Sequence, residues 1–411
     1  MTVIGLATTL AVTAALTATS ALTTTADATP APHLSQASTG SVFTPTNPPA
    51  RLLDTRDGGE PLGMDSTLTL PIADTAGVPA TANAVVLTVT AINPTAGSFL
   101  TVYPDGTTQP ATSNLDFTAG QTIANAVIVP LGTDGDIDIY NRNGSVDLSV
   151  DLSGYYATGT NGTFTTTTPT RILDTRNGTG TGGVIAPLGT STALQLAVTG
   201  AGTGVPSTGV TAVVLNLTVT NPTTGSFLTV YPDGSARPAT SNLNFAAGQT
   251  VANLVVVPVT DGTIDIWNLG GTTDVIADLV GYYTSGSGST FTAAGPTRVL
   301  DTRTGAGTNG VIAPLGSNSV VAIQVTGTAT GVPATATAVV LHLAATNATD
   351  GGFLTVYPDG TPQPITSNLD FTPGQVISNL VIVPVGTNGK IDIYNFSGTV
   401  DVIADLSGYY D

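Results

Sequence analysis

The hexapeptide Arg51-Leu-Leu-Asp-Thr-Arg56 decides the fold, because the chain carries it three times. It returns as Arg171-Ile-Leu-Asp-Thr-Arg176 and as Arg298-Val-Leu-Asp-Thr-Arg303. Two longer blocks keep step with it: Phe-Leu-Thr-Val-Tyr-Pro-Asp-Gly begins at Phe99, Phe227 and Phe353, and Asp-Leu-x-Gly-Tyr-Tyr begins at Asp151, Asp278 and Asp405. Motifs that recur together at a near-constant spacing indicate tandem structural units. The sequence therefore predicts three repeats, at 43–156, 164–283 and 291–410.

Each repeat has the pattern of an all-β unit. In the first repeat, short runs rich in β-branched residues lie at 84–90, 99–103, 123–130, 136–140 and 146–152, between turn residues. Asp134-Gly135, Asp261-Gly262 and Asn388-Gly389 predict two-residue hairpins in which both central residues have positive φ. We therefore expect an all-β protein of three tandem β-sandwich modules, jelly-roll or Greek-key-like, each of about 115–120 residues. The Gly/Ser/Thr-rich segments 157–163 and 284–290 would link them.

Composition excludes several classes of function. The 411 residues carry a net charge of −18 with nine basic residues, so nucleic acid is not an expected partner. The absence of cysteine excludes disulfides and thiolate metal centres, and two histidines leave little material for imidazole sites. We expect no cofactor.

The N-terminus has the pattern of an export signal. Residues 3–22 are apolar and are followed by small residues at 26–28, which predicts a signal peptide at 1–28 and a disordered Pro/Ser/Thr-rich linker at 29–42. The alternative is an uncleaved membrane anchor, since about 20 apolar residues can span a bilayer. No later run is long enough, so we expect no membrane span after signal removal. The protein would then be secreted, and either released or held non-covalently at the cell surface.

The three motif blocks resemble a known kind of repeat. The Arg-x-Leu-Asp-Thr-Arg, Ser-Asn-Leu-(Asp/Asn)-Phe and Asp-Leu-x-Gly-Tyr-Tyr blocks are similar to tandem β-repeats of secreted actinobacterial cell-surface proteins. The resemblance covers nearly all of the chain after residue 42. It implies a cell-surface setting, and no activity is established for the repeat itself.

Charged residues concentrate in two places of each repeat. Alternation along a strand would put Asp54 and Arg56 on one face and Arg51 on the other. Late in each repeat, two acids spaced by four share a strand face. We expect a structural ion-pair network that joins the first strand to the last. Its members are Arg51, Asp54, Arg56, Asp147 and Asp151, then Arg171, Asp174, Arg176, Asp274 and Asp278, then Arg298, Asp301, Arg303, Asp401 and Asp405.

The same carboxylates admit two other interpretations. Glycoside hydrolysis needs two carboxylates of which one has a raised pKa, whereas here each acid has an arginine available that would lower its pKa. Asp134, Asp136 and Asp138 form a weak calcium candidate in the first repeat. Lys390 occupies a ligand position of the third repeat, which argues against a calcium site shared by all three. We expect no enzyme and no resident metal.

The remaining candidates are one histidine and a set of aromatic residues. His342 takes the place of Thr88 and Asn216, which predicts a solvent-facing polar position. The motif Ile-Asp-Ile-(Tyr/Trp)-Asn would place an exposed aromatic ring beside an acid and an amide, a suitable platform for a sugar. The alternative is an aromatic ring covered by neighbouring residues. The candidate ligand-binding residues are Asp138, Tyr140 and Asn141, then Asp265, Trp267 and Asn268, then Asp392, Tyr394 and Asn395.

Three functions follow in order of preference. The first is a multivalent, non-catalytic binding or adhesion protein for cell-wall polymer or other extracellular glycan, in which several weak sites act together. The second is a structural spacer or a self-associating surface protein whose partner is another copy of itself. The third is a secreted glycan hydrolase.

Overall fold

A computed structural model describes residues 40–160 and 162–411, and these residues belong to one unit of the chain, Leu34–Asp411. The predicted signal peptide and residues 29–39 of the predicted linker lie outside the described residues. The regular secondary structure of the described part is entirely β, and the prediction of an all-β protein with tandem repeats is confirmed. No helix in this part is long and apolar enough to cross a lipid bilayer.

Each repeat contains eight strands in the same order. The first repeat has β1 (Val42–Asp54), β2 (Ser66–Pro71), β3 (Ala82–Ile92), β4 (Ser98–Pro104), β5 (Leu115–Phe117), β6 (Ile123–Pro130), β7 (Asp136–Asn141) and β8 (Asp147–Ala157). The second has β9 (Thr163–Asp174), β10 (Thr192–Ala197), β11 (Val210–Thr220), β12 (Ser226–Pro232), β13 (Leu243–Phe245), β14 (Val251–Pro258), β15 (Thr263–Asn268) and β16 (Asp274–Thr284). The third has β17 (Phe291–Asp301), β18 (Ser319–Gln324), β19 (Ala338–Thr346), β20 (Gly352–Pro358), β21 (Leu369–Phe371), β22 (Ile377–Pro384), β23 (Lys390–Asn395) and β24 (Asp401–Tyr410).

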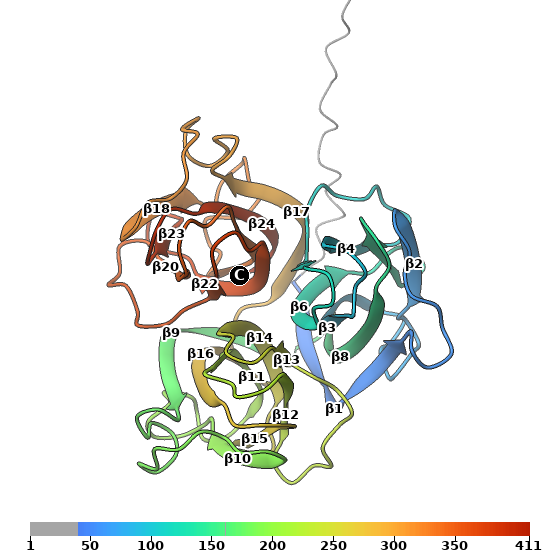
Figure 1. Cartoon of the computed structure of the whole chain (residues 1–411), viewed down its shortest axis with the longest axis vertical. Coiled ribbons are helices and arrows are strands. Elements are labelled where there is room, and N and C mark those ends of the chain that lie inside the picture. Colours follow the sequence, from blue (N-terminus) through green and yellow to red (C-terminus); the bar gives the residue numbers. More distant parts are fainter. Residues whose placement is uncertain (1–39, 161) are drawn as a thin grey trace, which may run out of the picture. The chain divides into compact units, whose positions relative to one another are not determined.

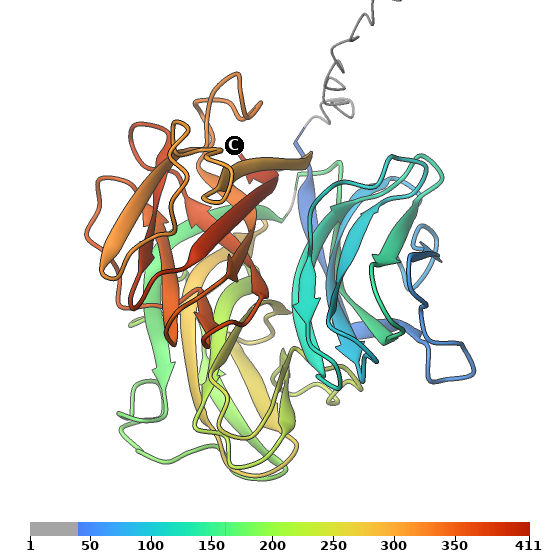
Figure 2. The same cartoon turned by 45° about the horizontal axis from the view of Figure 1, so that its top comes forward.

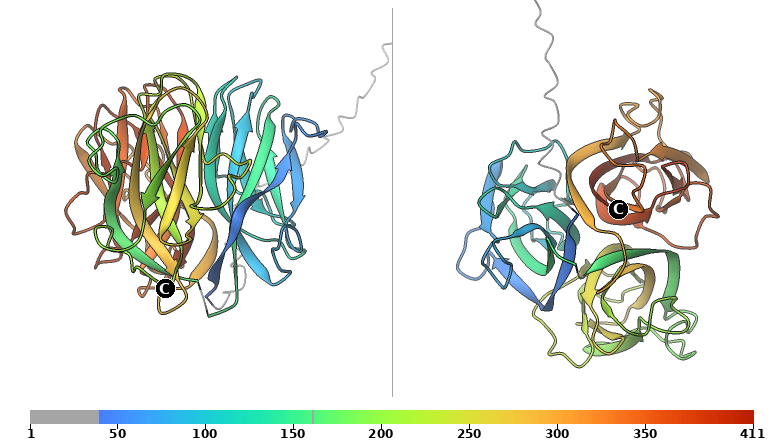
Figure 3. Two further views of the ribbon diagram at one scale, coloured as in Figure 1. Left: turned by 90° about the horizontal axis from the view of Figure 1, so that it is seen from below. Right: turned by 180° about the vertical axis from the view of Figure 1, so that it is seen from behind.

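The strands of each repeat divide between two antiparallel sheets. In the first repeat the sheet orders are β1-β8-β3-β6 and β2-β7-β4-β5. The second and third repeats have the same two orders, so the described residues form six four-stranded sheets. We call β1-β8-β3-β6 and its two counterparts the axial sheets, because they lie nearest the axis about which the three repeats are arranged (Figure 1). The other three are the outer sheets. The long strands run along this axis (Figures 2 and 3).

Both faces of an axial sheet are buried, which explains the unbroken apolar runs of the sequence. Along β3, Val85 and Leu87 belong to the cluster between axial and outer sheets, whereas Ala84 and Val86 belong to a second cluster on the axis. Because successive side chains of a strand point to opposite faces, one run of apolar residues supplies both clusters. Each cluster contains residues from all three repeats.

The predicted fold class of three tandem β-sandwich modules, jelly-roll or Greek-key-like, is wrong. The six small sheets instead belong to one propeller-like ring about a single axis, with the three axial sheets nearest the axis and the three outer sheets farther from it. The prediction assumed that each repeat buries a core of its own and stands as a separate module. The repeats instead share both hydrophobic clusters, because one face of each axial sheet has no cover within its own repeat.

A closed ring of six aromatic side chains occupies the axis. Each phenylalanine contacts the tyrosine of its own repeat and that of a neighbour, with centroid distances of 4.3–5.3 Å. The three tyrosine hydroxyls bond to one another in a triangle with O–O distances of 2.7, 2.7 and 2.8 Å. Burial raises the pKa of Tyr283 to about 12. The ring consists of Phe43, Tyr156, Phe164, Tyr283, Phe291 and Tyr410.

A second ring of hydrogen bonds joins the repeats through one asparagine of each. The side-chain oxygen of Asn253 accepts from the backbone N–H of Ala126, and that of Asn379 accepts from Leu254. Asn125 accepts from Leu380 and so closes the circle. The three repeats are therefore held together by specific polar contacts as well as by apolar packing.

The predicted hairpins differ in one detail. Asp261 and Gly262 both have positive φ, as expected, but at Asp134-Gly135 and Asn388-Gly389 only the glycine does. The loops between β6 and β7 and between β22 and β23 are one residue longer than that between β14 and β15. Longer hairpin loops commonly need positive φ at a single glycine.

Candidate functional site

The predicted arginines and acids meet in a compact cluster in each repeat. Arg51 binds both carboxylate oxygens of Asp151, at 2.7 and 3.1 Å, and reaches Asp54 at 2.8 Å. Arg56 binds Asp54 from the other side, at 2.8 and 2.6 Å. Corresponding bonds link Arg171 to Asp278 and Arg298 to Asp405. The two-pronged contact connects the first strand of a repeat to its last.

Two details of this network differ from expectation. Arg51 and Arg56 both contact Asp54, although alternation would place them on opposite faces. The register of β1 against β8 shifts between Arg51 and Leu53, and this irregularity turns Arg51 to the same side. Asp147 is held by the hydroxyl of Thr55 at 2.8 Å, with the same contact from Thr to Asp274 and Asp401 in the other repeats.

The carboxylates of the cluster have opposite pKa shifts. Hydrogen bonds from Arg56 lower the pKa of Asp54, as expected. Burial raises the pKa of Asp151 in spite of Arg51, and Asp278 and Asp405 behave in the same way. The expectation that arginine lowers the pKa of every candidate acid is therefore wrong, because desolvation of the deeply buried members outweighs the ion pair.

A loop from a neighbouring repeat covers each cluster. We call the three segments 111–116, 239–244 and 365–370 the boundary loops. The carbonyl of Ile365 accepts from Arg171 at 3.0 Å, and that of Ala111 accepts from Arg298 at 3.1 Å. At the first boundary, the backbone N–H of Ser241 donates to Asp151. The clusters thus lie at the boundaries between repeats, which strand periodicity alone does not reveal.

His342 is buried rather than solvent-facing. Its side chain is only 3% exposed, and its Nε2 lies 2.9 Å from the side-chain nitrogen of Asn114 in a boundary loop. Burial lowers the pKa of His342 to about 4. Thr88 and Asn216, at the same position, are buried as well. Asn216 and His342 each contact a boundary loop, so the polar residues at this position face protein rather than water.

The asparagines of the predicted sugar platform are internal. Asn141 is fully buried and donates to the carbonyls of Leu62, Gly63 and Gly144. Asn268 and Asn395 make the same kind of contacts. These amides hold loops in place, and their side chains do not reach the surface.

The acids of the platform lie beside tyrosines of the adjacent outer strand. Tyr103 pairs in register with Asp138, and the other repeats pair Tyr231 with Asp265 and Tyr357 with Asp392. Asp138 is buried and accepts from Thr69 at 2.7 Å. Burial raises the pKa of Asp265 and of Asp392.

The aromatic residues of the platform lie on the outer sheets, and the neighbouring strand has a phenylalanine as its second residue. We call the pairs Phe99/Tyr140, Phe227/Trp267 and Phe353/Tyr394 the aromatic patches. Phe227 lies 6.0 Å from Trp267, and Phe353 lies 6.4 Å from Tyr394. The three phenylalanines, Trp267 and Tyr394 are partly exposed, whereas Tyr140 is 8% exposed.

Each aromatic patch has different neighbours. Tyr140 donates to Asp65 at 2.6 Å, and Arg142 pairs with the same acid. A shallow hollow of about 410 Å³ lies beside Phe99. The guanidinium of Arg237 stacks 3.7 Å above the ring of Trp267. In the third repeat, Phe396 stacks on Phe353 at 4.7 Å and is 47% exposed.

The calcium candidate has no metal-binding geometry in the part of the chain that the structure describes. No three His, Asp or Glu residues there lie close enough to hold an ion. One oxygen of Asp138 is engaged by Thr69.

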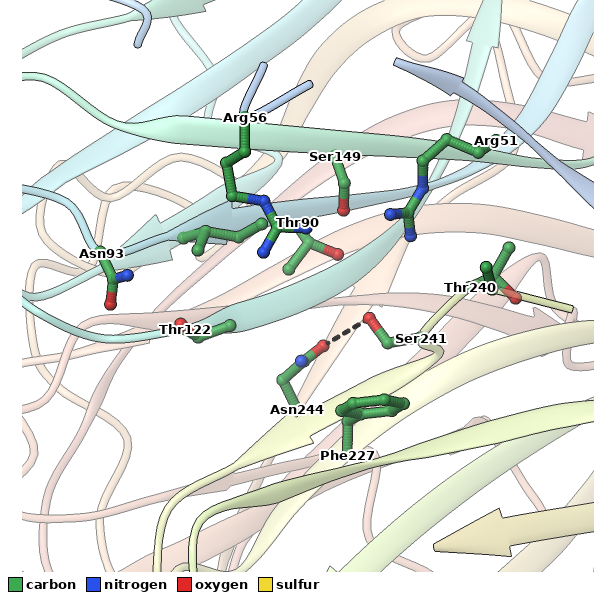
Figure 4. A pocket seen from close by; sticks show the side chains of 12 residues that line it. Arg51, Arg56, Thr90, Asn93, Thr122, Ser149, Phe227, Thr240, Ser241 and Asn244 are labelled. Atoms are coloured by element: carbon green, nitrogen blue, oxygen red, sulfur yellow. Dashed lines mark hydrogen bonds between the residues drawn. The ribbon is translucent and has the colours of Figure 1, made fainter. Parts of the chain in front are cut away.

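A cavity of about 350 Å³ lies at the first boundary, between repeats one and two. Figure 4 shows Arg51, Arg56, Thr90 and Ser149 on one wall and Ser241, Asn244 and Phe227 on the other. This cavity was not predicted from the sequence, although the Ser-Asn-Leu-(Asp/Asn)-Phe block marks the boundary loop that forms one wall.

Among known proteins, similarity is found to solved structures. No protein-family model matches the chain, and no curated protein matches it. Two solved structures align over most of the length with 11% identity. One is described as the triple jelly roll fold and turret assembly in an archaeal virus, with 90% of each chain covered and a TM-score of 0.20. The other is the atomic structure of Sulfolobus turreted icosahedral virus, with 89% and 90% covered and a TM-score of 0.19.

Proposed function

We propose that the protein is a secreted, non-catalytic binding protein that holds extracellular polysaccharide through its aromatic patches. One observation carries the proposal: a partly exposed aromatic side chain stands at the same place of the outer sheet in each repeat. Flat apolar rings with neighbouring hydrogen-bond groups suit the faces of sugar rings. Arg237 at Trp267 and Arg142 near Tyr140 supply such groups.

The arrangement of the patches supports binding at several points. All three belong to one body, so the distances between them are fixed by the fold. A polymer that contacts two patches gains affinity through high effective concentration without a tight single site. The net charge of −18 favours neutral polysaccharide over anionic wall polymers.

The experiment is retention of the full chain on insoluble cellulose, chitin, starch and peptidoglycan. Wild-type protein should be retained on at least one matrix and released by its soluble fragments. The double variant Trp267→Ala/Tyr394→Ala should lose most of the retention with an unchanged melting temperature. Val376→Ala, which alters an exposed apolar residue outside the patches, serves as the control. Equal retention of the double variant and wild type would refute binding through the patches.

Self-association at a surface is the second candidate, and a different observation favours it. Val184 and Ile185 of the second repeat are 62% and 67% exposed, and Val311 and Ile312 of the third are 60% and 68% exposed. Apolar groups exposed on this scale are typical of protein contacts when they gather. Sedimentation of the full chain over a range of concentrations tests this candidate, and a monomer at all concentrations would contradict it.

A further inference from the structure

The cavity at the first boundary contains buried polar groups without partners. The hydroxyl oxygens of Thr90 and Thr240 are buried and make no hydrogen bond within the part of the chain that the structure describes, and the two residues are 1% and 4% exposed. They come from different repeats and line the same cavity. Leaving a buried hydroxyl unpaired costs about 1–3 kcal/mol. A ligand with hydroxyl groups would supply the missing partners.

The charges around the cavity cancel. The guanidinium groups of Arg51 and Arg56 line it, but both are paired with carboxylates, those of Asp54 and Asp151. An anion would therefore find no free positive charge to bind, whereas a neutral ligand loses no ionic solvation. The other lining groups include the amides of Asn93 and Asn244 and the ring of Phe227. Hydroxyls, amides and one aromatic ring are the surroundings that a sugar requires.

The corresponding positions have different residues at the second boundary, between repeats two and three, and at the third boundary, between repeats three and one. At the first boundary, two residues paired across neighbouring strands carry two hydroxyl groups. The equivalent pair carries one hydroxyl group at the second boundary and none at the third. The three pairs are Thr90/Ser149, Thr218/Ile276 and Ala344/Ile403. The facing loop contributes the uncharged Asn244 at the first boundary but the acids Asp370 and Asp116 at the others. At the second boundary Thr218 and Thr366, the counterparts of Thr90 and Thr240, also lack partners, but Ile276 beside Thr218 is larger and apolar where the first boundary has Ser149. The strand pair of the first boundary therefore carries the most hydroxyl groups, and Ser149 is smaller than the isoleucine at the same position of the other two.

We infer that the first boundary is a binding site for a neutral polyhydroxy ligand, a glycan segment on the order of one or two sugar rings in size. Thr90, Ser149 and Thr240 bond its hydroxyl groups, and Phe227 packs against the face of a ring. Phe227 also belongs to an aromatic patch, but the remaining cavity residues do not. The site does not depend on the proposed binding through the patches, and separate variants test the two.

The test uses ligand-detected saturation-transfer NMR on the full chain. The probes are glucose, galactose, N-acetylglucosamine, cellobiose and maltose, each up to about 20 mM, a range that covers weak affinities. Wild type should give saturable transfer to at least one probe. Ser149→Ile, which installs the residue of the other two repeats, should abolish it, whereas Trp267→Ala and Ile276→Ser should retain it.

A second variant distinguishes a loss of binding from a loss of folding. Thr240→Val keeps the shape of the side chain and removes an unpaired hydroxyl, so its melting temperature should not fall. Its affinity for the same probe should fall by about tenfold, the value of one hydrogen bond. Three results would overturn the inference: no transfer to any neutral sugar, equal transfer in wild type and Ser149→Ile, or displacement of the sugar by millimolar sulfate. Failure of the polysaccharide retention assay alone would leave this site standing, since that assay reports on the patches.

Discussion

The axis and the aromatic patches are both built from aromatic side chains that recur in every repeat, yet they differ in how strictly they recur. On the axis, each repeat contributes one phenylalanine and one tyrosine, and the three hydroxyl contacts agree within 0.1 Å. In the patches the phenylalanine is constant, but its partner is Tyr140, Trp267 or Tyr394, and the neighbours are Arg142, Arg237 or Phe396.

The difference follows from what each ring contacts. Each axial phenylalanine packs against one other repeat and each axial tyrosine contacts both, so a change in one repeat alters the contacts of the others. A patch contacts residues of its own repeat, so the three can differ without disturbing closure. Assembly is therefore concentrated on the axis, and variation that can serve binding is concentrated at the periphery.

The same substitution in both regions gives the largest expected contrast. Phe164→Ala should lower the free energy of unfolding by about 3–5 kcal/mol, because it empties a fully enclosed site between two repeats. Phe353→Ala should cost less than about 2 kcal/mol, because this side chain is partly exposed. Urea unfolding of the full chain measures both. Equal losses would show that the axis is no more important to stability than the patches.

The stability of the second boundary, between repeats two and three, should depend on pH. Burial raises the pKa of Asp370 from 3.8 to about 7, so between these pH values the folded chain holds a proton that the unfolded chain has lost. Stability from this group is therefore full below about pH 4 and decreases as pH rises to about 7. Asp370→Asn, which copies Asn244, should stabilise the protein by about 1–2 kcal/mol at pH 8 and by little at pH 4.

Melting temperatures at the two pH values check this expectation. Asn244→Gln, at a position that does not titrate, is the control and should leave the difference between the two pH values unchanged. An equal effect of Asp370→Asn at both pH values would contradict a neutral carboxyl at this boundary.

The smallest effect is expected from removing a single hydroxyl of the axial triangle. Tyr283→Phe should cost about 0.5–1.5 kcal/mol, the usual value of one hydrogen bond. Because the pKa of Tyr283 is raised to about 12, wild type should lose stability as pH rises from about 10 towards 12, and the variant should lose less. Tyr282→Phe, one residue away and partly exposed, should change neither quantity. An identical alkaline profile for Tyr283→Phe and wild type would argue against the triangle as a source of stability.

Local patterns were sufficient to predict strands, but not closure of the ring. The runs at 84–90, 123–130 and 136–140 lie within β3, β6 and β7, because β-branched composition and turn residues act over a few positions. Alternation does not show what covers the second face of β3, since the covering residues belong to other repeats. The prediction of independent modules was wrong for this reason.

The site was predictable to a similar extent. The pairing of Arg51 with Asp151 could be predicted from recurring charges. The side of the strand on which Arg51 lies depends on a register shift, which cannot be recognised from residue types. His342 was expected at the surface because its counterparts are polar, and only the boundary loop with Asn114 explains its burial. Ser149 lines the cavity at a position where the other repeats have Ile276 and Ile403, a difference that is visible in the sequence but meaningful only once the neighbouring loop is in place.

The closed ring of asparagine contacts has a consequence for how the protein comes into being. In each repeat, one asparagine oxygen accepts a hydrogen bond from one neighbour, and one backbone N–H donates to the asparagine of the other neighbour. Three repeats therefore satisfy every donor and acceptor of the ring. A single repeat would have to find two others in solution, and the yield of such a trimer would depend on concentration. Joining the three in one chain makes the encounter intramolecular, so the body assembles equally well at any dilution. Under the proposed function of a secreted protein, this would preserve the assembled state where copies are few.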